Sequence, residues 1–161
     1  REHSLLVANI VRAISQGLVN AGVQISVEKA VAGALLHDIA KTACLQTGGD
    51  HSALGKEICL QHQLDEIADI VREHVRLRNY SLDGVYSEKE IVYYADKRVL
   101  HSSIVSLEKR MDDILARYGR DNHRLCRLIR ENFDLCRGVE RKLFKKLDFQ
   151  PADLEKIIQG L

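Results

Sequence analysis

The chain carries Leu35-Leu36-His37-Asp38-Ile39-Ala40-Lys41, in which a histidine and an aspartate stand side by side within an apolar run. Burying two such polar groups without partners is costly, so other side chains or a bound cation must satisfy them. The surrounding run from Val27 to Lys41 is apolar on most sides, which predicts a buried central helix that begins after an N-cap at Ser26. Lys41 lies three residues past the aspartate and shares its general face on such a helix.

The rest of the sequence predicts further helices and almost no strands. One proline, ten glycines and 5% aromatic residues accompany apolar positions at helical spacing, with little strict alternation. Loops are expected at Thr47–Asp50 and Asn79–Tyr86, and Ser87 with Glu90 matches a capping box. Helices are expected over residues 2–20, 27–41, 51–60, 64–76, 88–118 with an interruption at 101–103, 121–147 and 152–159. The sequence therefore predicts an all-α protein with one helical bundle over residues 1–118 and a C-terminal helical extension over 119–161 that packs on it.

Composition excludes several classes of protein. With 161 residues, 45% of them hydrophobic, 29% charged and a net charge of +1, the chain has an ordinary globular balance and no strongly basic surface for nucleic acid. No apolar run approaches the roughly 20 residues that span a bilayer, and no signal sequence opens the chain. The four cysteines lack zinc-finger spacing, which favours reduced thiols. We therefore expect a cytoplasmic protein that binds neither membranes nor nucleic acid, in an oligomeric state that the sequence does not indicate.

Six side chains form a candidate metal site. Imidazole and carboxylate donors favour zinc, manganese, iron, cobalt or nickel over calcium, and donor type does not choose among them. A carboxylate has two oxygens, so Asp38 could bridge two ions, and six donors exceed what one open catalytic ion usually takes. Lys41 beside the site would attract a phosphate. We thus expect one or two divalent ions, and the candidate ligands are His3, His37, Asp38, His51, His74 and Asp96.

Each ligand taken alone has a simpler interpretation. His3 could be solvated, His51 could neighbour a helix cap, His74 could be a core histidine, and Asp96 could form a surface ion pair of little energetic value. Asp50 is an alternative ligand or base. Further weak candidates for phosphate contact are Lys97 and Arg98, and we expect His62, His101 and His123 to be surface or structural residues.

The order His3, His37-Asp38 and Asp96 resembles the HD superfamily of metal-dependent phosphohydrolases, and His51 and His74 resemble the two extra histidines of its binuclear members. This resemblance covers about residues 3–98. It implies a helical bundle with the His-Asp helix at its centre. It also implies that His3, His37, Asp38 and Asp96 hold one ion, while Asp38, His51 and His74 hold the second.

The resemblance further implies hydrolysis of a phosphoester or phosphoanhydride in a small nucleotide-like substrate by a metal-activated water, with Asp38 and Lys41 as catalytic residues. The segment after His74 lacks the signature of the cyclic-di-GMP phosphodiesterases, and small stand-alone members such as symmetrical dinucleoside tetraphosphate hydrolases are more similar. A second interpretation is a non-catalytic or regulatory metal- and nucleotide-binding HD module. The run 95–110 is similar to HD domains appended to nucleotidyltransferases of the molybdenum-cofactor type, and the start at Arg1 fits an upstream fused domain. A purely structural helical scaffold is a third, weaker interpretation.

Overall fold

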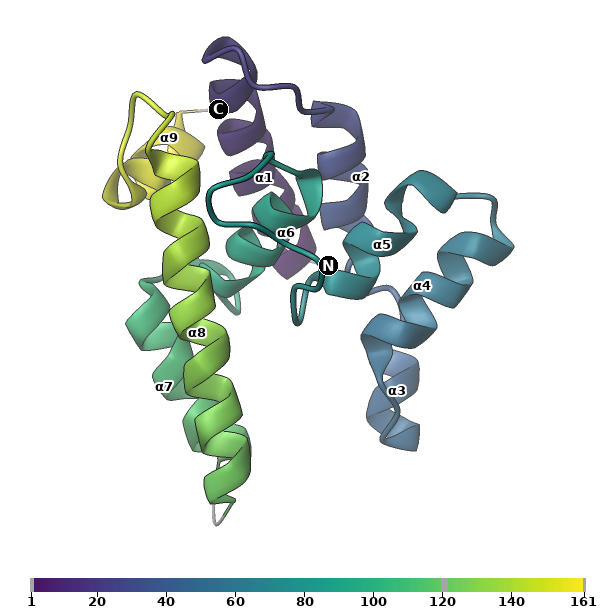
Figure 1. Cartoon of the computed structure of the whole chain (residues 1–161). Coiled ribbons are helices and arrows are strands. Elements are labelled where there is room, and N and C mark those ends of the chain that lie inside the picture. Colours follow the sequence, from purple (N-terminus) through teal and green to yellow (C-terminus); the bar gives the residue numbers. More distant parts are fainter. Residues whose placement is uncertain (1, 120–121, 161) are drawn as a thin grey trace.

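A computed structural model describes residues 2–119 and 122–160 of the chain (Figure 1). The described part is mostly helical, as the sequence predicts, and none of its helices is long and apolar enough to cross a membrane. The helices are α1 (Glu2–Asn20), α2 (Val27–Leu36), α3 (Lys41–Thr47), α4 (His51–Gln61), α5 (Asp65–Glu73), α6 (Glu88–Lys97), α7 (Leu107–Tyr118), α8 (His123–Phe144) and α9 (Leu154–Gln159), with a 3-10 turn at Pro151–Asp153 before α9.

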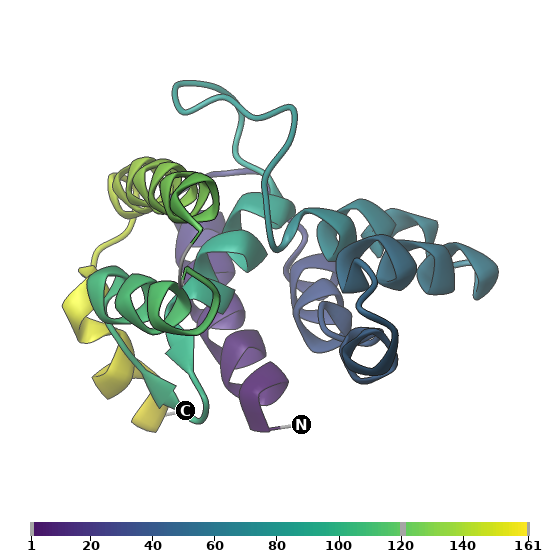
Figure 2. The same ribbon diagram turned by 90° about the horizontal axis from the view of Figure 1, so that it is seen from below.

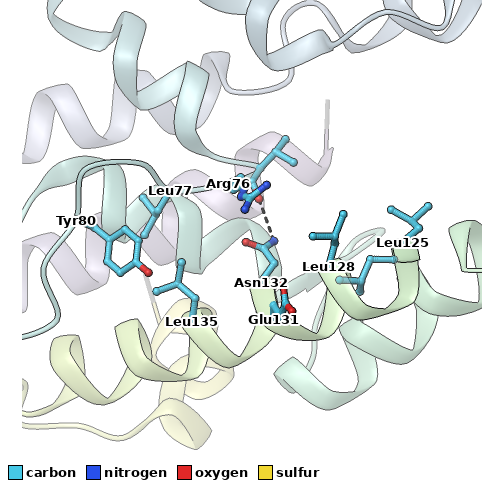
Figure 3. Close-up of a pocket in the computed structure, with 10 residues that line it drawn as sticks. Arg76, Leu77, Tyr80, Leu125, Leu128, Glu131, Asn132 and Leu135 are labelled. Carbon is cyan, nitrogen blue, oxygen red and sulfur yellow. Dashed lines mark hydrogen bonds between the residues drawn. The ribbon is translucent and has the colours of Figure 1, made fainter. Parts of the chain in front are cut away.

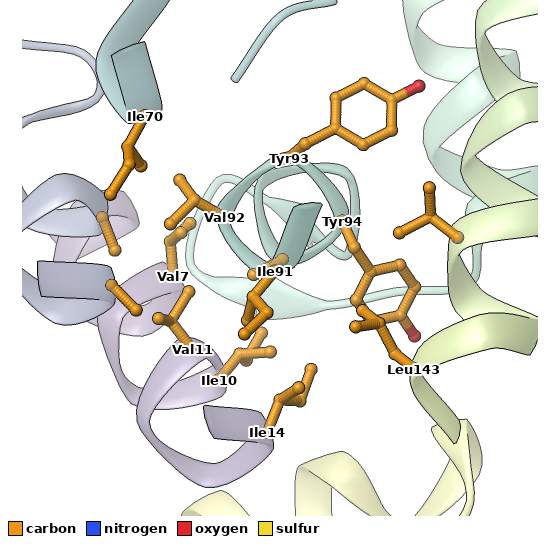
Figure 4. Packing of buried hydrophobic residues seen from close by; sticks show 14 of the residues in the cluster. Val7, Ile10, Val11, Ile14, Ile70, Ile91, Val92, Tyr93, Tyr94 and Leu143 are labelled. Carbon is orange, nitrogen blue, oxygen red and sulfur yellow. The ribbon is translucent and has the colours of Figure 1, made fainter. Parts of the chain in front are cut away.

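The core lies between α1 and α6, which cross at the centre of the molecule. Fully buried Val7, Ile10, Val11 and Ile14 recur at helical spacing along one face of α1 and pack toward the apolar face of α6 (Figure 4). Leu143 of α8 closes the other side of the same cluster. Helix α6 is thus buried almost all round, which fixes the position of Asp96 near its C-terminal end.

Two groups of helices flank this centre (Figure 1). Helices α2, α3, α4 and α5 lie on one side, and the antiparallel pair α7 and α8 lies on the other. Seen from below, the segment between α5 and α6 projects beyond the helices, and the N-terminus lies near the middle of the lower edge (Figure 2). The candidate ligands come from the central helix pair and from the α2–α5 side.

The expected helix from Val27 to Lys41 is wrong in its last third. Helix α2 ends at Leu36, and residues 37–40 form a turn held by three-residue hydrogen bonds, from Ile39 N to Leu36 O (2.9 Å) and from Lys41 N to Asp38 O (2.9 Å). Lys41 then begins α3. The apolar residues Ile39 and Ala40 continue a helical pattern, so periodicity alone could not reveal the turn. Because of this turn, His37 lies at the end of α2, and the chain changes direction before α3 begins.

Two other expectations need correction. The helix expected over 64–76 ends at Glu73, so His74 lies at its C-cap. The interruption near His101 is a short antiparallel hairpin that pairs Val99 with Ile104 and Leu100 with Ser103, whereas the sequence indicated almost no strands. His101 has a positive φ of 56° at the tight turn of this hairpin. Two-residue strands carry too few side chains to give an alternating pattern.

A buried ion pair ties α8 to the rest of the bundle. Lys142 Nζ lies 2.8 Å from Glu90 Oε1 of α6 and also donates to the carbonyls of Ser81 (2.8 Å) and Val85 (2.9 Å). The capping box of Ser87 and Glu90 is present as predicted, so the same glutamate serves the start of α6 and the anchor of α8. The division of the chain at residue 118 stays a prediction.

Candidate metal centre

The structure brings all six predicted ligands to one place at the junction of α1, α2, α4, α5 and α6. His3 lies in the first turn of α1, and Asp96 lies near the end of α6. His37 is the C-cap of α2 and His74 is the C-cap of α5. His51 is the first residue of α4, after an N-cap at Asp50. Helix ends therefore supply most of the site.

The first half of the site consists of His3, His37, Asp38 and Asp96. His3 Nε2 lies 3.0 Å from Asp96 Oδ1, and His37 Nε2 lies 3.5 Å from that same oxygen. His37 Nε2 is also 3.5 Å from Asp38 Oδ2. One ligand atom from each of His3, His37 and Asp38 lies within 4.8 Å of the others, as a shared cation requires.

The second half consists of His51, His74 and Asp38. The Nε2 atoms of the two histidines face one another at 3.2 Å, and they lie 3.5 Å and 3.6 Å from Asp38 Oδ1. These three residues also satisfy the 4.8 Å criterion. Asp38 thus turns Oδ2 to the first half of the site and Oδ1 to the second.

Two histidines are oriented by backbone carbonyls. Nδ1 of His37 lies 2.6 Å from the carbonyl of Ala34, and Nδ1 of His74 lies 2.6 Å from the carbonyl of Val71. A carbonyl only accepts hydrogen bonds, so both Nδ1 atoms carry hydrogen, and Nε2 of each ring is the nitrogen that faces the site. His37 Nε2 is buried and has no hydrogen-bond partner among the described residues.

The spacing of these atoms fits a metal centre. With metal–ligand bonds of about 2.1 Å and angles of about 90–110°, two ligand atoms lie about 3.0–3.4 Å apart. The close contacts of the site span 3.0 to 3.6 Å. Two imidazole Nε2 atoms at 3.2 Å, as in His51 and His74, have little reason to approach so closely unless a proton or a cation lies between them.

The electrostatics of the site favour a cation. Burial by itself would raise the pKa of Asp38, but the close approach of the imidazoles of His37 and His74 holds that pKa well below its usual range. The pKa of Asp96 is likewise well below normal, because its hydrogen bond with His3 and the nearby imidazole of His37 outweigh its burial. Burial alone would lower the pKa of His37, yet the two carboxylates raise it to about 10. The ionised carboxylates of Asp38 and Asp96 are mostly buried, so they require a positive charge beside them.

Two glycines allow the helices that carry the ligands to approach. A Cβ atom at Gly33 of α2 would lie 2.5 Å from Ile70 Cγ2 of α5. Gly33 lies one turn before His37, and Ile70 lies one turn before His74. A Cβ atom at Gly55 of α4 would lie 2.8 Å from Val71 Cγ1 of α5. These contacts set the 4.9 Å separation of the His37 and His74 rings and the 5.2 Å separation of the His51 and His74 rings.

Four of the six ligands, Asp38, His51, His74 and Asp96, form one wall of a cleft of about 470 Å³, a size that suits a small organic ligand. Lys41 also lines the cleft, and its Nζ lies 2.6 Å from Asp38 Oδ2. The opposite wall comes from α7 and α8 and includes Arg110 and Arg117. Sequence reasoning missed these two arginines, although the spacing Arg110, Asp113 and Arg117 marks one face of a helix.

The remaining candidates have other roles. Asp50 caps α4 through the amides of Ser52 and Ala53, and hydrogen bonding by Ser52 lowers its pKa to about 2. Arg98 is buried and donates to the carbonyls of Val105 and Pro151, which makes it structural. Lys97 lines the cleft, but its Nζ donates to the carbonyl of His74 at 2.9 Å and so holds that ligand's backbone. His62, His101 and His123 are exposed and lie outside the ligand sets, as expected.

A mostly helical bundle with two groups of histidine and aspartate around a shared carboxylate defines a class of helical protein whose site could hold metal ions. The HD domain family model matches residues 1–131, and the chain belongs to this family, whose members are typically metal-dependent phosphohydrolases. Searches of curated proteins and of solved structures gave no match. The match ends within α8 and includes all six ligands and both arginines of α7.

Proposed function

We propose that the chain is a metal-dependent phosphohydrolase that cleaves a phosphoester or phosphoanhydride in a small nucleotide-like substrate. The observation that carries this proposal is the placement of Asp38, whose two oxygens face two separate sets of histidines at one end of a cleft. Family membership supports the reaction class, and the cleft volume supports a substrate of nucleotide size.

The proposed ligands divide into two sets that share one residue. His3, His37, Asp38 and Asp96 would hold one divalent ion, and Asp38, His51 and His74 would hold the other. Iron, manganese, zinc, cobalt and nickel all suit these donors. When bound, such ions supply Lewis acidity that polarises a phosphoryl oxygen and lowers the pKa of water.

The protein's own residues supply orientation and proton transfer. Asp38 is central to both ligand sets and is the carboxylate best placed to orient the attacking water and accept its proton. Lys41 lies at the edge of the cleft with nearly half of its side chain exposed, so its ammonium can turn from Asp38 to a bound phosphate. There it would offset the negative charge that develops during the reaction.

The test is hydrolysis by purified protein supplied in turn with Mn²⁺, Co²⁺, Ni²⁺ or Fe²⁺ and a panel of nucleotides and p-nitrophenyl phosphate esters. We expect release of phosphate, nucleotide or nitrophenol with at least one metal. His37→Ala and Asp38→Ala should abolish release while the helical circular dichroism is preserved. His62→Ala is the matched control, because His62 is exposed and lies outside the site.

Two results would speak against this function. Activity that survives both His37→Ala and Asp38→Ala would reject the site. Binding of metal and nucleotide without turnover under every metal would instead favour a regulatory metal- and nucleotide-binding HD module.

A further inference from the structure

Helix α7 presents two arginines to the cleft, whose other wall carries the ligands Asp38, His51, His74 and Asp96. Arg110 and Arg117 are two turns apart and both line the cleft. The Arg110 side chain is mostly buried, with 15% of its area exposed, whereas Arg117 is 44% exposed. Neither residue is needed to complete the ligand sets, and the reaction proposed above leaves both without a role.

Asp113 holds both guanidinium groups in place. Its Oδ2 accepts from Arg110 Nη1 at 3.0 Å, and its Oδ1 lies 2.9 Å from Arg117 Nη2. One carboxylate between two arginines leaves one net positive charge on this wall. Because the two pairs follow one helix face at i, i+3 and i+7, the arrangement is rigid and preorganised.

Arg110 retains unused hydrogen-bonding capacity. A guanidinium has five N–H donors, and Asp113 is the partner of one nitrogen only. Nε of Arg110 is buried and has no acceptor among residues 2–119 and 122–160. Because Arg110 lines the cleft and its guanidinium has more donors than the one that Asp113 takes, an anion in the cleft would add hydrogen bonds to this group.

The rest of the far wall is mostly apolar, with Tyr118 and Asn132 as its polar members. Ile114 of α7 and Leu125, Ile129 and Phe133 of α8 line the cleft beside the arginines. The cleft adjoins a second hollow of about 430 Å³ along α8 (Figure 3). The two share Val75, Leu125, Ile129 and Asn132, and the second is otherwise bordered by three leucines, Arg76, Tyr80 and Glu131. An anion bound by α7 thus has room and apolar surface for an organic group next to it.

We propose that the cleft binds an organic compound with two or more linked phosphates, in which Arg110 and Arg117 hold a phosphate other than the one that lies at the ligand wall. This inference rests on the proposed function only for the position of the reacting phosphate. Arginine suits the task because its planar fork makes paired hydrogen bonds to phosphate oxygens. Arg110 and Arg117 are thus specificity-determining residues, which favour substrates that carry a second phosphate.

The test measures binding rather than turnover. Dissociation constants for ADP, AMP and inorganic tripolyphosphate are determined by calorimetry on the full chain, with Mn²⁺ present throughout. We expect ADP to bind at least tenfold more tightly than AMP. ADP should also bind more tightly than tripolyphosphate, because only the nucleotide covers the apolar wall.

Variants then assign the preference to α7. Arg110→Gln should reduce the ADP-over-AMP ratio to twofold or less. Arg117→Gln should reduce the ADP-over-AMP ratio several-fold. Because Arg117 is the more exposed of the two arginines, this variant tests the inference even if Arg110→Gln fails to fold. The matched control is Arg127→Gln on α8, because Arg127 is 71% exposed and does not line the cleft. It should leave the ratio unchanged.

The outcomes separate this inference from the proposed function. Equal binding of ADP and AMP by the wild type, or a preference that survives both Arg110→Gln and Arg117→Gln, would overturn it even if the protein hydrolyses phosphate esters. An arginine-dependent preference for ADP would support it even if no metal gives turnover. Tripolyphosphate binding as tight as ADP binding would overturn the organic part of the proposal.

Discussion

Nζ of Lys41 lies 2.6 Å from Oδ2 of Asp38, the same carboxylate oxygen that faces His37. The lysine therefore neutralises the carboxylate that both ligand sets share. The turn at residues 37–40 makes this contact, because it ends α2 and starts α3 at Lys41 itself. A metal ion held by Asp38 would repel the Lys41 ammonium and displace it from the carboxylate. The ammonium could then pair with a phosphate in the cleft.

Lys41→Met should separate metal binding from catalysis. Without the ammonium, Asp38 keeps all its metal-facing oxygens, so metal content should stay equal or increase. Turnover of a phosphate ester should fall about 10- to 100-fold, because a cation that offsets developing charge is lost. Steady-state kinetics and metal analysis on the same sample measure both effects.

The control for Lys41→Met is Lys56→Met. Lys56 also pairs with an aspartate at 2.6 Å, but that pair is exposed and lies outside the cleft. Loss of bound metal in Lys41→Met would show that the lysine supports the ligands rather than the substrate.

Gly33→Ala should weaken the metal centre from a distance. A methyl group at this position would meet the Cβ region of Ile70, which cannot move aside as a flexible chain end could. Overpacking of this kind costs about 1–3 kcal/mol of unfolding free energy and would push α2 away from α5. We expect a lower midpoint in urea and weaker metal binding.

Gly160→Ala is the matched control for Gly33→Ala, since its added methyl would have no neighbour closer than 3.6 Å. Metal affinity that is unchanged in Gly33→Ala would show that the close approach of α2 and α5 does not set the ligand geometry.

Lys142→Met should destabilise the whole bundle. The change leaves the Glu90 carboxylate buried without its cation and leaves the carbonyls of Ser81 and Val85 without a donor. Loss of one partner from a buried pair typically costs about 3–5 kcal/mol. Chemical denaturation should show this loss.

A double variant distinguishes the pair from simple packing. Adding Glu90→Leu to Lys142→Met should restore part of the lost stability, because no buried charge then lacks a partner. Lys29→Met, which breaks an exposed pair with Glu66, should leave the unfolding midpoint almost unchanged. Equal effects of Lys142→Met and Lys29→Met would contradict the role of the buried pair.

Metal binding should release protons. Despite burial, the carboxylates of Asp38 and Asp96 raise the pKa of His37 to about 10, so the free site holds a proton there at pH 7 to 9. A metal must displace that proton. Apparent affinity should therefore rise by about tenfold per pH unit for each proton released, and it should fall as the pH is lowered.

Calorimetry in two buffers of different ionisation enthalpy gives the number of protons released. Affinity that stays constant from pH 7 to pH 9 would contradict the charge balance described for His37.

The ligand set could largely be predicted from the sequence, whereas the surrounding cleft wall could not. Buried histidine and aspartate must be satisfied wherever they occur, so His37 and Asp38 signal a site before any fold is known. The resemblance then related them to His3, His51, His74 and Asp96. All six meet in the structure, whereas their metal-binding roles stay predictions.

Other features could not be predicted from the sequence, and each has a physical reason. The turn after Leu36 lies within an apolar run whose periodicity continues a helix, and the hairpin strands are too short to alternate. Arg110 and Arg117 reach the cleft only because α7 packs against α8 beside α6, and charged helix faces are usually solvated. The Glu90–Lys142 pair joins residues 52 positions apart, which no local pattern encodes.

Metal stoichiometry across a set of variants tests the shared role of Asp38 most directly. Inductively coupled plasma mass spectrometry on metal-loaded, desalted protein should give two ions per chain for the wild type. His3→Gln and His51→Gln should each retain about one ion, from opposite halves of the site, and Asp38→Asn should retain less than either. A wild-type chain with no more than one ion, or an Asp38→Asn chain that binds as much metal as His51→Gln, would contradict a carboxylate shared by two metal ions.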